Sequence, residues 1–210
     1  MRNKIIFSLI VMSISGWALA STPVANIKVT GSITPPTCKI NGQDDVNLEY
    51  KFDIDRGILN DSGTTELDSA INNIEVICDA TTYLGFTAID HRQDSSLYPG
   101  ASTLYHGLGF FDTDKKIGFY LMIMKNATVK QDTSSVSESV NIANLGISQK
   151  SMPLANNGRY VFGNSWTSLK SGKVFNADIE VKPTISSQFK SSWSDESLDG
   201  YATLAFSFSL

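Results

Sequence analysis

Residues 25–38 read ANIKVTGSITPPTC, and the interpretation of the whole chain starts from this stretch. Small or apolar residues occupy alternate positions from residue 25 to residue 33, with Gly31 among them. Alternation with a period of two is typical of a strand that has one buried face. Pro35 and Pro36 follow, and they lack the N–H donors that a continuous central strand needs. We therefore expect the alternating segment to be separate from the chain after it.

The residues that precede this stretch have a different character. Arg2 and Lys4 come before an apolar run over residues 5–12, and residues 18–20 (ALA) provide the small side chains of a cleavage site. This pattern is typical of a secretory signal peptide. The apolar run is also shorter than the roughly 20 residues that a membrane-spanning helix needs. We expect residues 1–20 to be removed and the mature chain to be exported.

Period-two alternation also dominates the chain after the prolines. No stretch shows the spacing of an amphipathic helix, and turn residues such as Asn41-Gly42 separate the alternating runs. Short alternating strands between turns favour an all-β protein, and their number suits a sandwich. The expected strands cover residues 46–54, 74–78, 84–88, 117–123, 175–181 and 202–210.

Cys38 and Cys78 are the two cysteines of the sequence. In an exported chain, an even pair favours a structural disulfide over a metal or catalytic site. Closing a loop of about 40 residues would stabilise the fold by roughly 4 kcal/mol.

Composition and motifs argue against two functional classes. The net charge of −4 and the lack of any basic run argue against a nucleic-acid partner. His91 and His106 are the only histidines, no nucleophile-elbow, zinc-protease or phosphate-loop motif occurs, and we expect both histidines to lie in surface loops. Residues 53–57 resemble the opening of a calcium loop but lack its closing glutamate, so a turn is expected there. The chain is therefore expected to be no enzyme, with no catalytic residue, metal or cofactor.

Taken in order, these features resemble the pilin subunits of chaperone–usher fimbriae. The signal peptide, the alternating residues around Gly31, Pro36, the cysteine pair and the alternating strand that Gly200 and Tyr201 open all contribute to the resemblance. It implies an incomplete immunoglobulin-like β-sandwich that a donor strand from a partner completes. The implied organisation is a signal peptide (1–20), an N-terminal donor-strand extension (21–34) and a pilin domain (35–210).

The resemblance also implies roles for individual residues. The donor strand would present Ala25, Ile27, Val29, Gly31 and Ile33. The strand that docks on the chaperone would comprise Gly200, Tyr201, Ala202, Leu204, Phe206, Phe208 and Leu210. The implied function is that of a structural fimbrial subunit, exported through the periplasm to the surface of a Gram-negative bacterium. Its implied partners are a periplasmic chaperone, an outer-membrane usher, neighbouring subunits and a possible host receptor.

Three alternatives remain open. The chain could be a minor adaptor or tip subunit that binds a receptor or carbohydrate, with Trp166, Trp193, Tyr98 and Tyr105 as a stacking surface. The N-terminal alternation could instead be the first strand of a complete sandwich. An outer-membrane barrel is less favoured, because the strands are unevenly spaced and long polar stretches interrupt them.

Overall fold

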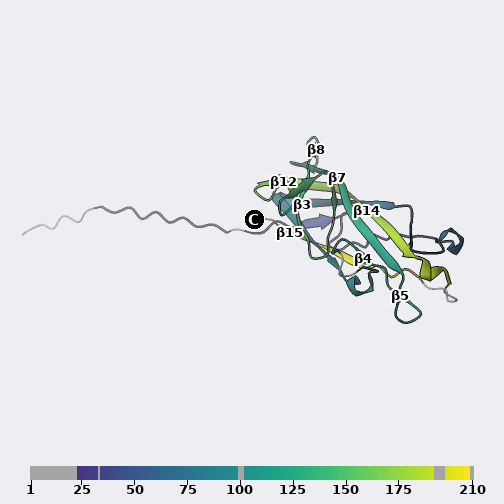
Figure 1. Cartoon of the computed structure of the whole chain (residues 1–210). Helices are drawn as coiled ribbons and strands as arrows, with labels where there is room; N and C mark the ends of the chain where they lie inside the picture. Colours follow the sequence, from purple (N-terminus) through teal and green to yellow (C-terminus); the bar gives the residue numbers. More distant parts are fainter. Residues whose placement is uncertain (1–22, 33, 99–101, 192–196, 209–210) are drawn as a thin grey trace, which may run out of the picture. The chain divides into compact units, whose positions relative to one another are not determined.

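The computed structural model describes residues 23–32, 34–98, 102–191 and 197–208 (Figure 1). The chain divides into two units, the first ending at Thr34 and the second beginning at Pro35. The described residues of the first unit form neither helix nor strand, and all of their side chains are exposed. The predicted signal peptide lies outside the described residues.

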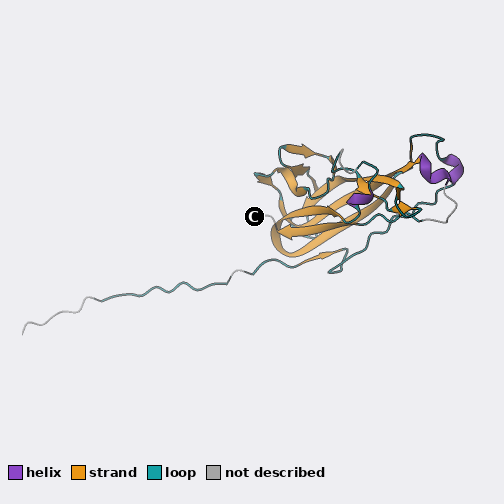
Figure 2. Ribbon diagram, turned by 60° about the horizontal axis from the view of Figure 1, so that its bottom comes forward, coloured by secondary structure: helices purple, strands orange, loops and turns teal. Residues whose placement is uncertain are grey.

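The second unit is all-β, as the sequence predicts (Figure 2). No helix among the described residues is long and apolar enough to cross a membrane. In the part of the chain that the structure describes, three short 3-10 helices interrupt the strands: η1 (Arg56–Ile58), η2 (Gln93–Ser95) and η3 (Ser187–Ser191). The strands are β1 (Cys38–Ile40), β2 (Thr64–Glu66), β3 (Ala70–Asp90), β4 (His106–Gly107), β5 (Phe110–Phe111), β6 (Lys115–Lys116), β7 (Gly118–Lys130), β8 (Glu138–Ser139), β9 (Ile142–Asn144), β10 (Ile147–Gln149), β11 (Ser151–Pro153), β12 (Arg159–Ser165), β13 (Ser168–Leu169), β14 (Ser171–Ser186) and β15 (Ala202–Phe208).

Strand β3 organises the sheet. Among the described residues, thirteen strands join one antiparallel sheet with the main order β10-β9-β12-β3-β14-β7-β11, and β5 and β6 form a separate hairpin. The first half of β3 pairs with β1 and β14, whereas its second half pairs with β12 and β15. The sheet curls around one hydrophobic core. Figure 2 shows its long strands folded back over one another.

Large side chains from β3, β12 and β14 fill this core. Phe86 stacks on Tyr160 with ring centroids 5.3 Å apart, and Phe162 meets Phe175 edge to face at 5.4 Å. All four side chains are almost fully buried. Complete burial of an apolar side chain of this size contributes about 1.5–3 kcal/mol, so this aromatic cluster supports the strands that frame it.

The predicted disulfide is confirmed. Cys38 on β1 and Cys78 on β3 face each other in the antiparallel register, and their sulfur atoms are 2.02 Å apart. The bridge fastens the start of the second unit to its longest strand.

Two details of the predicted strands are wrong. The runs at 74–78 and 84–88 belong to the single strand β3, because β14 and then β12 and β15 supply partners along its length. The run at 46–54 is extended and alternates as expected, but no strand pairs with it among the described residues.

Candidate functional site

The candidate site is an apolar groove, and residues 45–54 form one side of it. We call this segment the extended wall. Leu48, Tyr50 and Phe52 are among its alternate side chains that pack against the core, whereas the residues between them are exposed. Side chains hold the wall in place: Asn72 donates from Nδ2 to the Glu49 carbonyl at 3.0 Å, and the Tyr50 hydroxyl donates to the Ile179 carbonyl at 2.9 Å. Within the described residues the wall makes no backbone ladder.

Strand β15 forms the opposite side of the groove. It pairs antiparallel with β3, Ala202 opposite Asp90 and Phe208 opposite Leu84. His91 N–H donates to the Tyr201 carbonyl at 2.9 Å, and the backbone groups of an antiparallel strand alternate in direction. Ala202, Leu204 and Phe206 therefore direct their N–H and C=O groups away from β3. No other described strand pairs with that edge.

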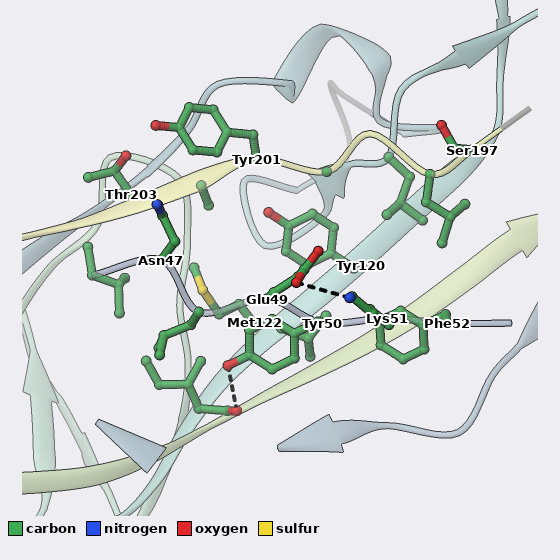
Figure 3. A pocket seen from close by; sticks show the side chains of 18 of the residues that line it. Asn47, Glu49, Tyr50, Lys51, Phe52, Tyr120, Met122, Ser197, Tyr201 and Thr203 are labelled. Atoms are coloured by element: carbon green, nitrogen blue, oxygen red, sulfur yellow. Dashed lines mark hydrogen bonds and ion pairs between the residues drawn. The ribbon is translucent and has the colours of Figure 1, made fainter. Parts of the chain in front are cut away.

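Core side chains form the floor between the two walls. The groove encloses a cavity of about 1020 Å³. Figure 3 shows Tyr120 and Met122 on β7 between the extended wall and β15. Gly200 lies close above this floor, since a Cβ atom there would come within 3.0 Å of Tyr120. The other floor residues are Ile74, Leu108, Ile179, Val181 and Phe189.

The hydroxyls of Tyr50 and Tyr120 in the groove stay neutral. Burial raises the pKa of Tyr50 to about 12, with hydrogen bonding to Asn72 opposing the shift. Burial also raises the pKa of Tyr120 above its ordinary value, and the charge of Asp90 adds to the effect. The floor therefore offers an uncharged surface, which suits apolar side chains better than ions.

Charge gathers on the rim of the extended wall. Asp45, Glu49 and Asp53 are exposed at every fourth position and line the groove, and so does Lys51. Lys51 lies 3.2 Å from Glu49, and both side chains are about three-quarters exposed, at 77% and 73%. The facing wall, by contrast, contributes no charged side chain to the groove from residue 197 to residue 206.

His106 and Asp90 form a buried polar pair beside the floor residue Tyr120. His106 is fully buried on β4, so its prediction as a surface-loop residue is wrong; His91 is exposed as predicted. The His106 ring stacks on Tyr120, its Nε2 lies 2.7 Å from the Leu154 carbonyl, and its Nδ1 lies 3.7 Å from Asp90 Oδ2. A carbonyl only accepts, so Nε2 carries a proton and donates it to Leu154, and in the neutral ring Nδ1 carries none.

Asp90 lies opposite Ala202, where the pairing of β15 with β3 begins. Its carboxylate accepts from the backbone N–H groups of Arg92 and Gly107, at 2.8 and 2.9 Å. Burial lowers the pKa of His106, against opposing contributions from Leu154 and Asp90. Within the described residues no cluster of three or more potential metal ligands occurs.

The predicted donor residues lie in the first unit. Ile27 and Val29 are each 90% exposed, and Ala25 and Gly31 are exposed as well. A Cβ atom on Gly31 would meet no atom within 4 Å, so the chain's own fold does not require glycine there. Ile33 lies outside the described residues.

The predicted docking strand corresponds to β15. Ala202, Leu204 and Phe206 pack against the core, and Phe206 lies 5.5 Å from Phe86 between ring centroids. Tyr201 and Phe208 are exposed by 52% and 37%. Leu210 lies outside the described residues.

The extended wall is a part of the site that the sequence did not predict. Its signal was present, since apolar residues alternate with polar ones, three of them acidic, from Asp45 to Asp53. Tyr98 and Tyr105, from the alternative stacking surface, do lie together at 6.1 Å, while Trp193 lies outside the described residues.

No protein-family model and no curated protein matches the chain.

Proposed function

We propose that this chain is a structural subunit of a surface fimbria. In this proposal the second unit is an immunoglobulin-like sandwich that lacks one strand, and a donor strand from a partner completes it. The observation that carries the proposal is the groove, where an apolar floor lies between a strand edge and an extended segment that both lack a backbone partner among the described residues.

Adding a strand to the groove would pair the free backbone edge and cover the apolar floor. An inserted strand pairs its N–H and C=O groups with the free edge of β15, and its alternate side chains enter the floor. The same chain carries a segment suited to this use, because Ile27 and Val29 are 90% exposed. Burying each in a partner's groove would contribute about 1.5–3 kcal/mol.

Gly31 fits the same proposal. A glycine inside an alternating segment weakens a strand, yet nothing in its own chain approaches this one. A close approach to a partner's groove gives the glycine a physical reason.

Export and protection of the groove follow from the same chemistry. An apolar groove of this kind promotes aggregation, so a periplasmic chaperone would fill it with a strand paired to β15 before a neighbouring subunit replaces that strand at the usher. The Cys38–Cys78 bridge suits an oxidising compartment.

The decisive experiment compares the exported full chain with a variant lacking residues 21–34. We expect the full chain to form a ladder of oligomers that resists SDS without heating, and the deletion variant to remain disulfide-bonded but to form no ladder. The matched controls alter one row of the segment at a time. Ile27→Ser with Val29→Ser should remove the ladder, and Asn26→Ser with Thr30→Ser should keep it. An intact ladder from the deletion variant would contradict the proposal.

A further inference from the structure

We propose that Met122 is an oxidation site of this protein, where a hydroperoxide that enters the open groove converts the thioether to a sulfoxide. The product places a polar S=O group in the apolar floor and weakens the binding of an apolar strand there. Only this second effect rests on the proposed function, because the access of the oxidant to Met122 depends on the groove alone.

Thioethers are the oxidisable sulfur groups of the mature chain. The disulfide between the two cysteines of the sequence leaves no free thiol. Two of the five methionines lie in the predicted signal peptide. The mature chain therefore keeps three thioethers, at Met122, Met124 and Met152.

Met122 differs from the other two methionines in what it faces. Among the described residues that line the groove, it is the only one that contains sulfur, and Figure 3 shows it between the extended wall and β15. Met122 is 5% exposed, whereas Met124 on the same strand is fully buried. Met124 lies opposite Met152 on β11, and neither of these two lines the groove. The groove thus gives a small oxidant a path to one thioether of the three.

The size and the walls of the groove favour this access. Its cavity of about 1020 Å³ has room for many molecules as small as water, each of which takes about 30 Å³ in the liquid, so a peroxide can enter. The extended wall makes no backbone ladder within the described residues. Segments of this kind open locally at a lower free energy than paired strands do, and such opening widens the path to the floor.

The oxidation step balances without any group other than the peroxide. A lone pair of the Met122 sulfur attacks one peroxide oxygen, so that an S–O bond forms and the O–O bond breaks. The departing hydroxide takes the proton of the transferred oxygen and leaves as water. The thioether is oxidised, the peroxide is reduced, and a flexible apolar side chain becomes polar.

The sulfoxide oxygen would lack a hydrogen-bond donor once a strand covers it. Val181 lies opposite Met122 on β14, and its side chain and that of Ile179 in the same floor are apolar. The Tyr50 hydroxyl already donates to the Ile179 carbonyl. An apolar strand would therefore remove water from the oxygen and leave a buried acceptor unpaired, which should weaken its binding about tenfold to hundredfold.

Oxidation mapping tests the site. The soluble full-length subunit is treated with hydrogen peroxide, with and without a peptide of residues 21–34, and mass spectrometry follows the oxygen gained by each methionine. We expect Met122 to be oxidised about tenfold faster than Met124 and Met152, and the peptide to slow the reaction at Met122 alone. Equal rates at the three methionines would overturn the site.

A substitution without sulfur tests the effect on binding. Met122→Leu keeps nearly the same side-chain volume, so after peroxide treatment it should bind a fluorescent form of the peptide as well as before. Met124→Leu is the matched control, and it should lose affinity about tenfold to hundredfold on treatment, as the wild-type chain does. An equal loss in Met122→Leu would show that the sulfoxide at residue 122 is not the cause.

The outcomes separate this inference from the proposed function. If the untreated chain binds the peptide and the three methionines are oxidised alike, the oxidation site is wrong and the function of the groove stands. If Met122 is oxidised first and the untreated chain binds no donor peptide, the proposed function fails and the oxidation site stands.

Discussion

Two segments of this chain share one sequence pattern and have opposite structures. Residues 25–31 and strand β15 both place small or apolar side chains at alternate positions. β15 pairs with β3 along its whole length, and Phe206 packs on Phe86. The N-terminal segment forms no strand, and Val29 is 90% exposed.

The difference shows what alternation can and cannot specify. A period of two states that a segment is able to form a strand with one buried face. Whether the partner edge belongs to the same chain is a property of the whole fold. In this protein residues 25–31 and the free edge of β15 both lack a partner strand among the described residues, and both have the alternation that suits strand pairing. This situation is expected when the partner is another molecule.

The largest expected effect comes from placing a large side chain at Gly31 in the N-terminal segment. Gly31→Arg should abolish polymer and leave the subunit folded, because a Cβ at residue 31 meets nothing in its own chain. The measurement is the SDS-resistant ladder, together with disulfide mapping of the soluble subunit. Ser32→Arg is the control, because residue 32 lies between two of the alternating small or apolar positions, and this variant should still polymerise. Loss of folding with Gly31→Arg would make residue 31 part of an intramolecular strand.

The second prediction concerns the other segment. Phe206→Ser should destabilise the second unit by about 2–4 kcal/mol, because it removes a ring that packs against Phe86 and the core. Phe208→Ser should cost less than about 1 kcal/mol, since its side chain is 37% exposed at the end of the described strand. Urea unfolding of the chain with a bound donor peptide of residues 21–34 measures both. Equal losses for the two variants would contradict the packing of β15.

These two segments also mark how far the sequence could lead. Alternation was enough to predict the all-β fold and the strand at 202–210, which the structure describes as far as Phe208, and the cysteine pair was enough for the disulfide. The unpaired state of the extended wall was not predictable, because Leu48, Tyr50 and Phe52 alternate as they would in a paired strand. The burial of His106, expected in a surface loop like His91, was not predictable either, because its neighbours give no periodic signal. Its burial depends on Leu154, 48 residues away, and on a ring of β7.

The third prediction uses the pH dependence of the support behind the groove. Burial lowers the folded-state pKa of His106 below its ordinary value of 6.5. The unfolded chain then binds more protons, so stability is complete above about pH 6.5 and falls as the pH drops below it, by at most about 1.4 kcal/mol per pH unit. Asp90 and Tyr120 face the ring, and the Asp90 charge reduces the loss.

Unfolding free energies measured between neutral and mildly acidic pH test this dependence. His106→Gln should flatten the curve below pH 6.5, and His91→Gln, at an exposed histidine, should leave it unchanged. An unaltered slope in the His106 variant would assign the acid sensitivity to other groups.

The smallest expected loss of stability concerns the extended wall, which makes no backbone ladder within the described residues. Tyr50→Phe removes the hydroxyl that donates to the Ile179 carbonyl and keeps the ring on the floor, so it should cost about 1 kcal/mol.

Alkaline pH should have a related effect, since burial raises the folded-state pKa of Tyr50 from 10.0 to about 12. The stability that this residue contributes is complete below about pH 10 and is lost as the pH rises toward 12. The variant should not show that part of the loss. Tyr83→Phe, at a tyrosine that is 44% exposed, provides the control. Because the wall makes no backbone ladder within the described residues, its amides should exchange fast over residues 45–54, faster still in Tyr50→Phe, and the exchange should slow when a donor peptide fills the groove. A wall equally protected with and without the peptide would mean that it does not need a partner strand.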